Sequence, residues 1–280
     1  MSTSTLPDLR SLEQRRVILK MTDASRRGHI ASALSILEIV RVLYDSILRV
    51  DPARPTWKDR DRFILSKGHG CMALYLLLAE QGFFPYEELF RFTKFDSILG
   101  SHPDLEKVPG CEASTGSLGH GLPIGVGLAL AARMEKASWR VFVLVGDGEC
   151  QEGTTWEAAV VASKHRLDHL AVLVDSNKMQ CFSTVREVGD LEPFADKWRA
   201  FGFAVREVDG HDPVALREAL EALPYEAGRP SCLICHTVKG KGVLRMEGSP
   251  AWHHANRVTD EQMQGLYEDL EEVARASHLS

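Results

Sequence analysis

The chain has 280 residues, 44% of them hydrophobic and 26% charged, which fits a globular protein with a sizeable buried core. The formal net charge is −6 and no Lys/Arg block occurs, so nothing indicates a nucleic acid or membrane partner. No stretch approaches the roughly 20 unbroken apolar residues of a membrane span, and the first residues lack the apolar core of a signal peptide. We therefore expect a cytoplasmic protein. Its six scattered cysteines indicate reduced thiols, and the Cys232/Cys235 pair falls in an apolar run typical of a buried strand.

Helical spacing dominates the first part of the chain. Residues 9–23 predict an amphipathic helix, and Ser32 is placed to cap a second one. After a loop over DPARPTW, the run RFILSKGHG predicts a strand and a Gly-His-Gly turn, followed by a helix from about 71 to 81. The chain then becomes irregular from about 94 to 118.

Strands and helices alternate after this point. A Gly-rich turn opens a helix in which Gly121, Gly125 and Ala129 form a small-residue face, which lets another helix approach closely within the protein or between subunits. Apolar runs predict strands at 140–147, 169–176, 203–209 and 231–238, with helices at about 152–165, 191–201 and 212–223. Such alternation predicts an α/β fold with helices on both faces of a parallel sheet.

We expect a single domain over residues 1–280. Its tail, from about residue 239, is polar and rich in glycine until a final helix near 259–276. Segments of this kind commonly carry function, so we expect the tail to wrap over a site or a partner.

Two consecutive strands end in polar turns, GDG and DSN. A right-handed crossover places such strands side by side, so Asp147 and Asn177 are expected at one crevice, with the N-terminus of the crossover helix favouring an anion. Together with a carbonyl near Met179 they offer hard oxygen ligands, which suit Mg²⁺ or Ca²⁺ and not Zn²⁺. Asp and Asn are also common turn formers, but two such turns on adjacent strands favour a metal-bridged diphosphate.

The spacing of GDG and the later Asn resembles the thiamine diphosphate signature. Over nearly its full length the chain is similar to the N-terminal, cofactor-diphosphate-binding half of transketolase. The motifs that carry this resemblance, in the family's order, are SRRGHIAS, LSKGHG, GSHPD, STGSLGHGL, GDGECQEG, VDSNKM, VDGHD and HTVKGKGV. It implies the thiamine-diphosphate-binding fold, with thiamine diphosphate and Mg²⁺ as cofactors and Ca²⁺ as a substitute metal.

The resemblance also implies roles for individual residues. Asp147, Asn177 and the main-chain carbonyl of Met179 correspond to the metal ligands. The implied cofactor-binding residues are His69, Gly116, Ser117, Leu118, Gly146, Asp147, Gly148, Asn177, Met179 and His253. The implied catalytic residues are His29, His102 and His253. The family usually has Gly after the last of these, whereas this chain has His254, so either histidine is a candidate for the site.

Glu152 and Glu157 match acidic residues that the family places at a subunit interface. They are equally compatible with ordinary acids in the first turns of a helix.

The implied activity is transfer of a two-carbon ketol unit from a ketose or ketose phosphate to an aldose. A full transketolase has further domains, so we expect a second chain that carries the pyrimidine-binding and C-terminal domains, in an α₂β₂ assembly. Three alternatives stay open: the α subunit of a 2-oxo acid dehydrogenase or decarboxylase, a non-catalytic subunit of the same fold, and a plain Mg²⁺-nucleotide binder. SKGHG, GSHPD and KGKGV favour transketolase.

Overall fold

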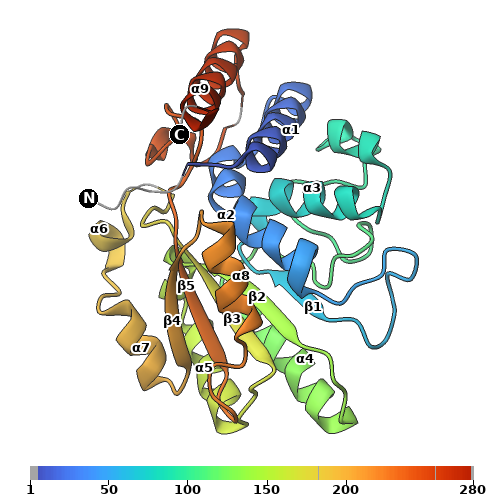
Figure 1. Cartoon of the computed structure of the whole chain (residues 1–280), viewed down its shortest axis with the longest axis vertical. Coiled ribbons are helices and arrows are strands. Elements are labelled where there is room, and N and C mark those ends of the chain that lie inside the picture. The colour runs from blue at the N-terminus through green and yellow to red at the C-terminus, as the bar shows by residue number, and fades with distance from the viewer. Residues whose placement is uncertain (1–5, 182, 256, 279–280) are drawn as a thin grey trace.

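A parallel sheet forms the centre of the molecule (Figure 1). The computed structural model describes residues 6–181, 183–255 and 257–278. Its five strands are ordered β1-β2-β3-β5-β4. They are β1 (Arg62–Leu65), β2 (Val141–Gly146), β3 (Leu170–Ser176), β4 (Ala204–Asp209) and β5 (Ser231–His236). Each strand lies within an apolar run that predicted it.

Helices cover both faces of the sheet, as predicted. Successive strand residues alternate between two cores: Phe142 and Leu144 pack into one, whereas Val143 and Val145 pack into the other. The first core lies under α1 (Leu9–Ser25), α2 (Ile30–Val42), α3 (Cys71–Gln81), α8 (Pro213–Glu221) and α9 (Asp260–His278). The second lies under α4 (Gly121–Glu135), α5 (Gly153–Lys164) and α7 (Phe194–Ala200). That the chain forms one domain stays a prediction.

The small-residue face of α4 packs on the sheet at Gly125. Gly125 lies so close to β2 that an added Cβ would come within 2.4 Å of the Val143 Cγ2 atom. Ala129, one turn further on, is fully buried. At Gly125 the face allows α4 to approach a strand closely, and α4 also contacts α5.

Helix α2 begins earlier than predicted. It starts at Ile30, and His29 occupies the N-cap position without a side-chain hydrogen bond. Ser32 was predicted as the cap, but it lies inside the helix, fully buried, and its hydroxyl has no hydrogen-bond partner among the described residues. The backbone N–H of Ser32 instead donates to the carbonyl of His29, so the turn is closed by the main chain. The helix continues into a π-helical turn over Leu43–Ile47.

The predicted helix at 191–201 is shorter in the structure and is preceded by an unpredicted one. Helix α7 covers only Phe194–Ala200, directly after Pro193. Helix α6 (Val185–Gly189) is held by a capping box between Thr184 and Glu187.

The buried CxxC pair cannot act as a redox pair in this fold. Cys232 packs into one core and Cys235 into the other, because they stand on opposite faces of β5. Both are free thiols and fully buried. Within the described ranges, none of the helices combines the length and apolar character needed to cross a membrane.

Candidate active site

The two polar turns meet at one edge of the sheet. β2 and β3 are parallel neighbours with Gly146 opposite Asp175, so Asp147 and Asn177 leave the sheet together. A cavity of about 350 Å³ opens there. The predicted site residues that line it are His29, His69, His102, Gly116, Leu118, Gly146, Asp147, Gly148, Asn177, Met179 and His253. Ser117 is exposed and does not line it.

Asp147 is a buried carboxylate held by two backbone N–H groups. Its Oδ1 accepts the backbone N–H of Gly148 at 2.8 Å, and its Oδ2 accepts that of Lys178 at 2.6 Å. Burial, together with the negative charge of Asp175, raises the pKa of Asp147 from its usual value of 3.8 to about 6. A cation beside Asp147 would offset this cost.

Asn177 and Met179 supply the neighbouring oxygens. The Asn177 side chain donates to Asp175 at 2.6 Å, and its Oδ1 accepts the Met179 N–H at 2.9 Å. In the described part of the chain, no group of three or more His, Cys, Asp or Glu could hold a metal ion. One carboxylate, one amide oxygen and one carbonyl are donors that fit a hard cation, which would take further oxygens from a bound diphosphate and water.

Two buried lysines line this cavity that were not predicted from the sequence. Lys67 follows β1 and forms a buried ion pair with Asp175. Lys239 is only 2% exposed, and no ion pair joins it to a carboxylate of the described residues. Burial, then the charge of Lys67, lower the pKa of Lys239 to about 8. An ammonium group in this position favours an anionic ligand in the cavity.

Four histidine rings gather at the same cavity. The His29 ring centroid lies 5.3 Å from that of His69, 5.9 Å from that of His102 and 5.8 Å from that of His253. Burial is the main cause that lowers the pKa of His29 to about 3, that of His253 to about 4, and that of His69 well below its usual value. These imidazoles are neutral at neutral pH, so each carries one N–H and one free ring nitrogen.

The structure shows which of the last two histidines, His253 or His254, lines the cavity. His253 lines the cavity, and its Nδ1 lies 2.6 Å from the Lys239 Nζ. His254 is exposed and does not line the cavity, but its ring centroid lies 4.4 Å from that of His29. His254 therefore covers His29 from the rim.

The segments that carry these histidines are joined although they are far apart in sequence. Gly28 and Ala255 exchange two backbone hydrogen bonds of 3.0 and 3.1 Å, and the Val258 N–H donates to Arg26 at 2.9 Å. The tail thus places Lys239 and His253 at the cavity before α9 packs beside α1 (Figure 1).

A glycine turn closes a third side of the cavity. Gly116 has a φ of +150°, and a Cβ there would lie 3.0 Å from the His102 ring. The turn is held by Glu149, a buried carboxylate that accepts the N–H of Gly119 at 2.9 Å and that of Gly146 at 3.0 Å. Glu149 was not predicted, although it stands inside the GDGEC motif. Of the two proposed interface acids, Glu152 lines the cavity and both are exposed.

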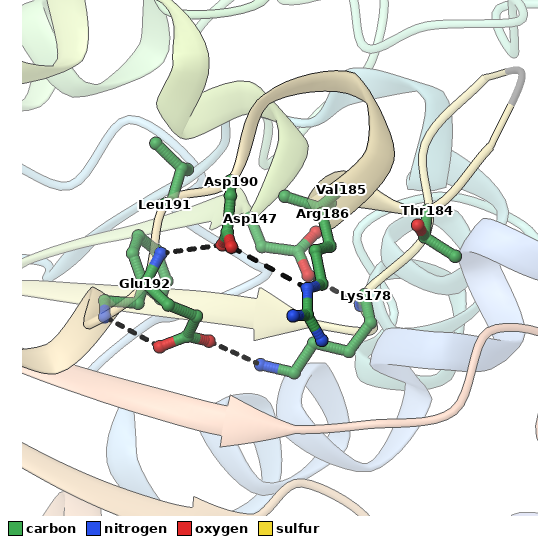
Figure 2. A pocket seen from close by; sticks show the side chains of 9 residues that line it. Asp147, Lys178, Thr184, Val185, Arg186, Asp190, Leu191 and Glu192 are labelled. Atoms are coloured by element: carbon green, nitrogen blue, oxygen red, sulfur yellow. Dashed lines mark hydrogen bonds and ion pairs between the residues drawn. The ribbon is translucent and has the colours of Figure 1, made fainter.

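A second, larger cavity of about 550 Å³ shares Asp147 with the first (Figure 2). Its cations already have partners, since Lys178 lies 4.0 Å from Glu192 and Arg186 lies 3.8 Å from Asp190. None of the site histidines lines it. The smaller cavity therefore contains most of the predicted site residues, despite the difference in volume.

Comparison with known proteins decides the family. Residues 10–269 match the family described as "Transketolase, thiamine diphosphate binding domain". The chain belongs to the transketolase family. Its parallel sheet is the sheet of the thiamine-diphosphate-binding fold, as predicted.

Similar transketolase proteins include short subunits of comparable length. The chain is 40% identical over 275 residues to an apulose-4-phosphate transketolase subunit from Phocaeicola vulgatus, covering 98% of this chain and 97% of that protein. It is 42% identical over 244 residues to 6-deoxy-6-sulfo-D-fructose transketolase subunit SqwG from a Clostridium species, covering 87% and 88%.

Solved transketolases share the fold but are longer. The transketolase from Campylobacter jejuni superposes with a TM-score of 0.84 at 29% identity, over 94% of this chain and 43% of that chain. This chain thus spans less than half of a solved transketolase. The predicted transketolase-type subunit is confirmed over the 2-oxo acid dehydrogenase alternative, because the full-length relatives are transketolase subunits.

Proposed function

We propose that the chain is the cofactor-diphosphate-binding subunit of a split transketolase that moves a two-carbon ketol unit from a ketose or ketose phosphate to an aldose. One observation carries the proposal: the same cavity gathers Asp147, Asn177, the buried Lys239 and the histidine cluster. A diphosphate, a divalent cation and a sugar all have matching groups there. We also keep the cytoplasmic location as a prediction.

The diphosphate of thiamine diphosphate would lie between the lysines and the metal ligands. Lys67 and Lys239 supply positive charge, while Asp147, Asn177 and the Met179 carbonyl would hold Mg²⁺, or Ca²⁺ in its place. Backbone groups of Gly146 and Gly148 also border this region, so a phosphate oxygen can approach them closely. Gly116, Ser117 and Leu118 would meet the aminopyrimidine ring through their backbone, and His69 would lie near the diphosphate.

The bound thiamine diphosphate would supply an electron sink for cleavage of the carbon–carbon bond beside the sugar carbonyl. The chain itself supplies neutral imidazoles. His29 and His102 each have a ring nitrogen that can hold a substrate hydroxyl and take up its proton. The Nδ1 of His253 accepts from the Lys239 ammonium, so its Nε2–H can donate to a substrate oxygen. Burial keeps these rings uncharged, so proton uptake starts from the neutral form at neutral pH.

A second chain would complete the enzyme. The proposed partner carries the pyrimidine-binding and C-terminal domains, in an α₂β₂ assembly; support for a partner comes from the similar proteins of comparable length, which are named as subunits. Helix α5 offers a surface for subunit contact, since Val160 is 53% exposed and Val161 is 37% exposed beside Glu157.

Isothermal titration tests the cofactor proposal. Thiamine diphosphate with Mg²⁺ is titrated into the purified chain, alone and with its co-purified partner, beside Asp147→Ala. The matched control is Asp190→Ala, which removes a carboxylate from the second cavity only. We expect binding that the partner tightens, that Asp147→Ala abolishes and that the control keeps. Absence of binding in every mixture would refute the cofactor assignment.

An activity assay tests the reaction. The complex should transfer a ketol unit between sugars and should not decarboxylate 2-oxo acids; the reverse pattern would replace the proposal by the dehydrogenase-type alternative.

A further inference from the structure

A buried triad of an arginine, a carboxylate and a histidine lies against the backbone segment that carries Lys239. Glu38 of α2 pairs with the Arg15 Nη1 at 2.5 Å and with the His211 Nδ1 at 3.0 Å, and all three side chains are at most 1% exposed. Burial by itself would raise the pKa of Glu38, but the charge of Arg15 and the hydrogen bond from His211 hold it well below its usual range. Glu38 is therefore ionised at neutral pH.

The two outer members of the triad bind the same stretch of backbone. The His211 Nε2 accepts the Val238 N–H at 2.9 Å, and the Arg15 Nε donates to the Lys241 carbonyl at 2.8 Å. Because the Nε2 atom accepts, the ring proton must be on Nδ1, from which it is donated to Glu38. One carboxylate thus sets both the tautomer of His211 and the orientation of Arg15.

Lys239 lies between these two anchored backbone groups. Its Nζ faces the cavity, 2.6 Å from the Nδ1 of His253. We infer that Arg15, Glu38 and His211 are positioning residues that fix Lys239, and through it His253, for an anionic ligand. The part of this inference that concerns an anionic ligand rests on the proposed diphosphate site.

General stability is a weaker explanation for the triad. A buried ion pair commonly stabilises a fold no better than apolar side chains of the same volume. Apart from one bond from Arg15 to its own helix, the side-chain hydrogen bonds that the triad makes to other residues go to the segment that carries Lys239. Apolar residues of the same volume could not form these hydrogen bonds, so they could not hold that segment in place.

Two substitutions at one position separate the two contacts of His211. In His211→Asn the side-chain amide can still reach Glu38, but the acceptor for the Val238 N–H is lost. In His211→Gln the longer side chain places an oxygen near the former Nε2 and can keep that acceptor. Thermal unfolding measured by circular dichroism checks that each variant folds, and Arg15→Lys, which removes the bond to Lys241, serves as a second test if His211→Asn does not fold.

The first measurement needs no ligand. The rate at which acetic anhydride modifies Lys239 is measured by mass spectrometry in the full chain. Loss of one hydrogen bond, about 1.4 kcal/mol, should raise this rate about tenfold in His211→Asn. His211→Gln should stay near the wild-type rate. Equal rates in the wild type and His211→Asn, with both folded, would overturn the inference.

The second measurement shows whether the triad acts through the lysine. The affinity for thiamine diphosphate with Mg²⁺ is titrated, with the partner present, for His211→Asn, Lys239→Met and the double variant. We expect His211→Asn to weaken binding about tenfold in the wild-type background and not at all beside Lys239→Met. The same loss in both backgrounds would mean that His211 acts without Lys239 and would refute the positioning role. Failure of the wild type to bind would refute the proposed function alone, because the acylation rates decide the placement of Lys239 independently.

Discussion

Replacing Asp147 by Asn should change how the stability of the metal-free chain depends on pH. The folded chain raises the pKa of this carboxyl from 3.8 to about 6, so between these values the folded state binds more protons than the unfolded state. Its stability must therefore fall as pH rises through this window. The penalty is absent below the unfolded pKa and complete above the folded one. Asn at this position cannot ionise, so the variant lacks this part of the pH dependence.

The size of the effect follows from the shift. Each pKa unit corresponds to about 1.4 kcal/mol, so the full penalty is about 3 kcal/mol, of which about 2–3 kcal/mol develops between pH 4 and pH 7. The assay is urea unfolding in a chelator at several pH values in that range, followed by circular dichroism. The free energy of unfolding of the variant minus that of the wild type should rise by this amount. The pH-dependent part of the hydrogen bonds that Asp147 accepts is already contained in its folded pKa, and the pH-independent part cancels from the comparison.

A control isolates the buried carboxyl. Asp196→Asn removes an acid whose side chain is 67% exposed, and it is measured in the same way as a reference. If the difference for Asp147→Asn rises with pH no more than it does for this reference, Asp147 is not destabilised by burial in the metal-free chain, and the electrostatic argument for a cation there is refuted.

Three further outcomes are expected. Lys67→Met leaves a fully buried carboxylate unpaired and should lower the free energy of unfolding by about 3–5 kcal/mol in urea; an unchanged midpoint would contradict this. Gly125→Ala should cost about 1–3 kcal/mol because its Cβ would meet β2, whereas Gly127→Ala on the same helix meets no atom within 4 Å and should stabilise by up to about 1 kcal/mol; equal effects would refute the packing argument. His253→Asn should lower kcat/KM for ketol transfer about 100-fold or more, whereas His254→Gly at the rim should stay within about tenfold; the opposite order would exchange their roles.

The sheet and its ligand edge were predictable from sequence because strands buried on both faces become continuous apolar runs. A polar residue directly after such a run is conspicuous, which is why the chain order alone places Asp147 and Asn177 together. The order of the last two strands was not predictable. β5 inserts between β3 and β4, and nothing in the chain order of these strands indicates which one takes the edge.

There is a physical reason why Lys67 and Lys239 were not predicted as site residues. Lysine is usually a solvated surface residue, so Lys67 and Lys239 gave no signal of burial until Asp175 and the tail were placed around the cavity. The early start of α2 was missed because its first turn is closed by the main chain and lacks a side-chain cap. Helix α6 did carry a signal, the Thr184 to Glu187 capping box, but its five residues are too few for apolar periodicity.

The bridge of two backbone hydrogen bonds between Gly28 and Ala255 affects the order in which the protein folds. Its two residues lie near opposite ends of the chain, so during synthesis the sheet can form well before this bridge can. The cluster of four histidines is then the last part of the site to form, because closing a very long loop costs conformational entropy. Cleavage of the backbone between Lys239 and His253 would disrupt only the histidine cluster. The cleaved chain should therefore retain its folded sheet and lose the ability to bind its ligand.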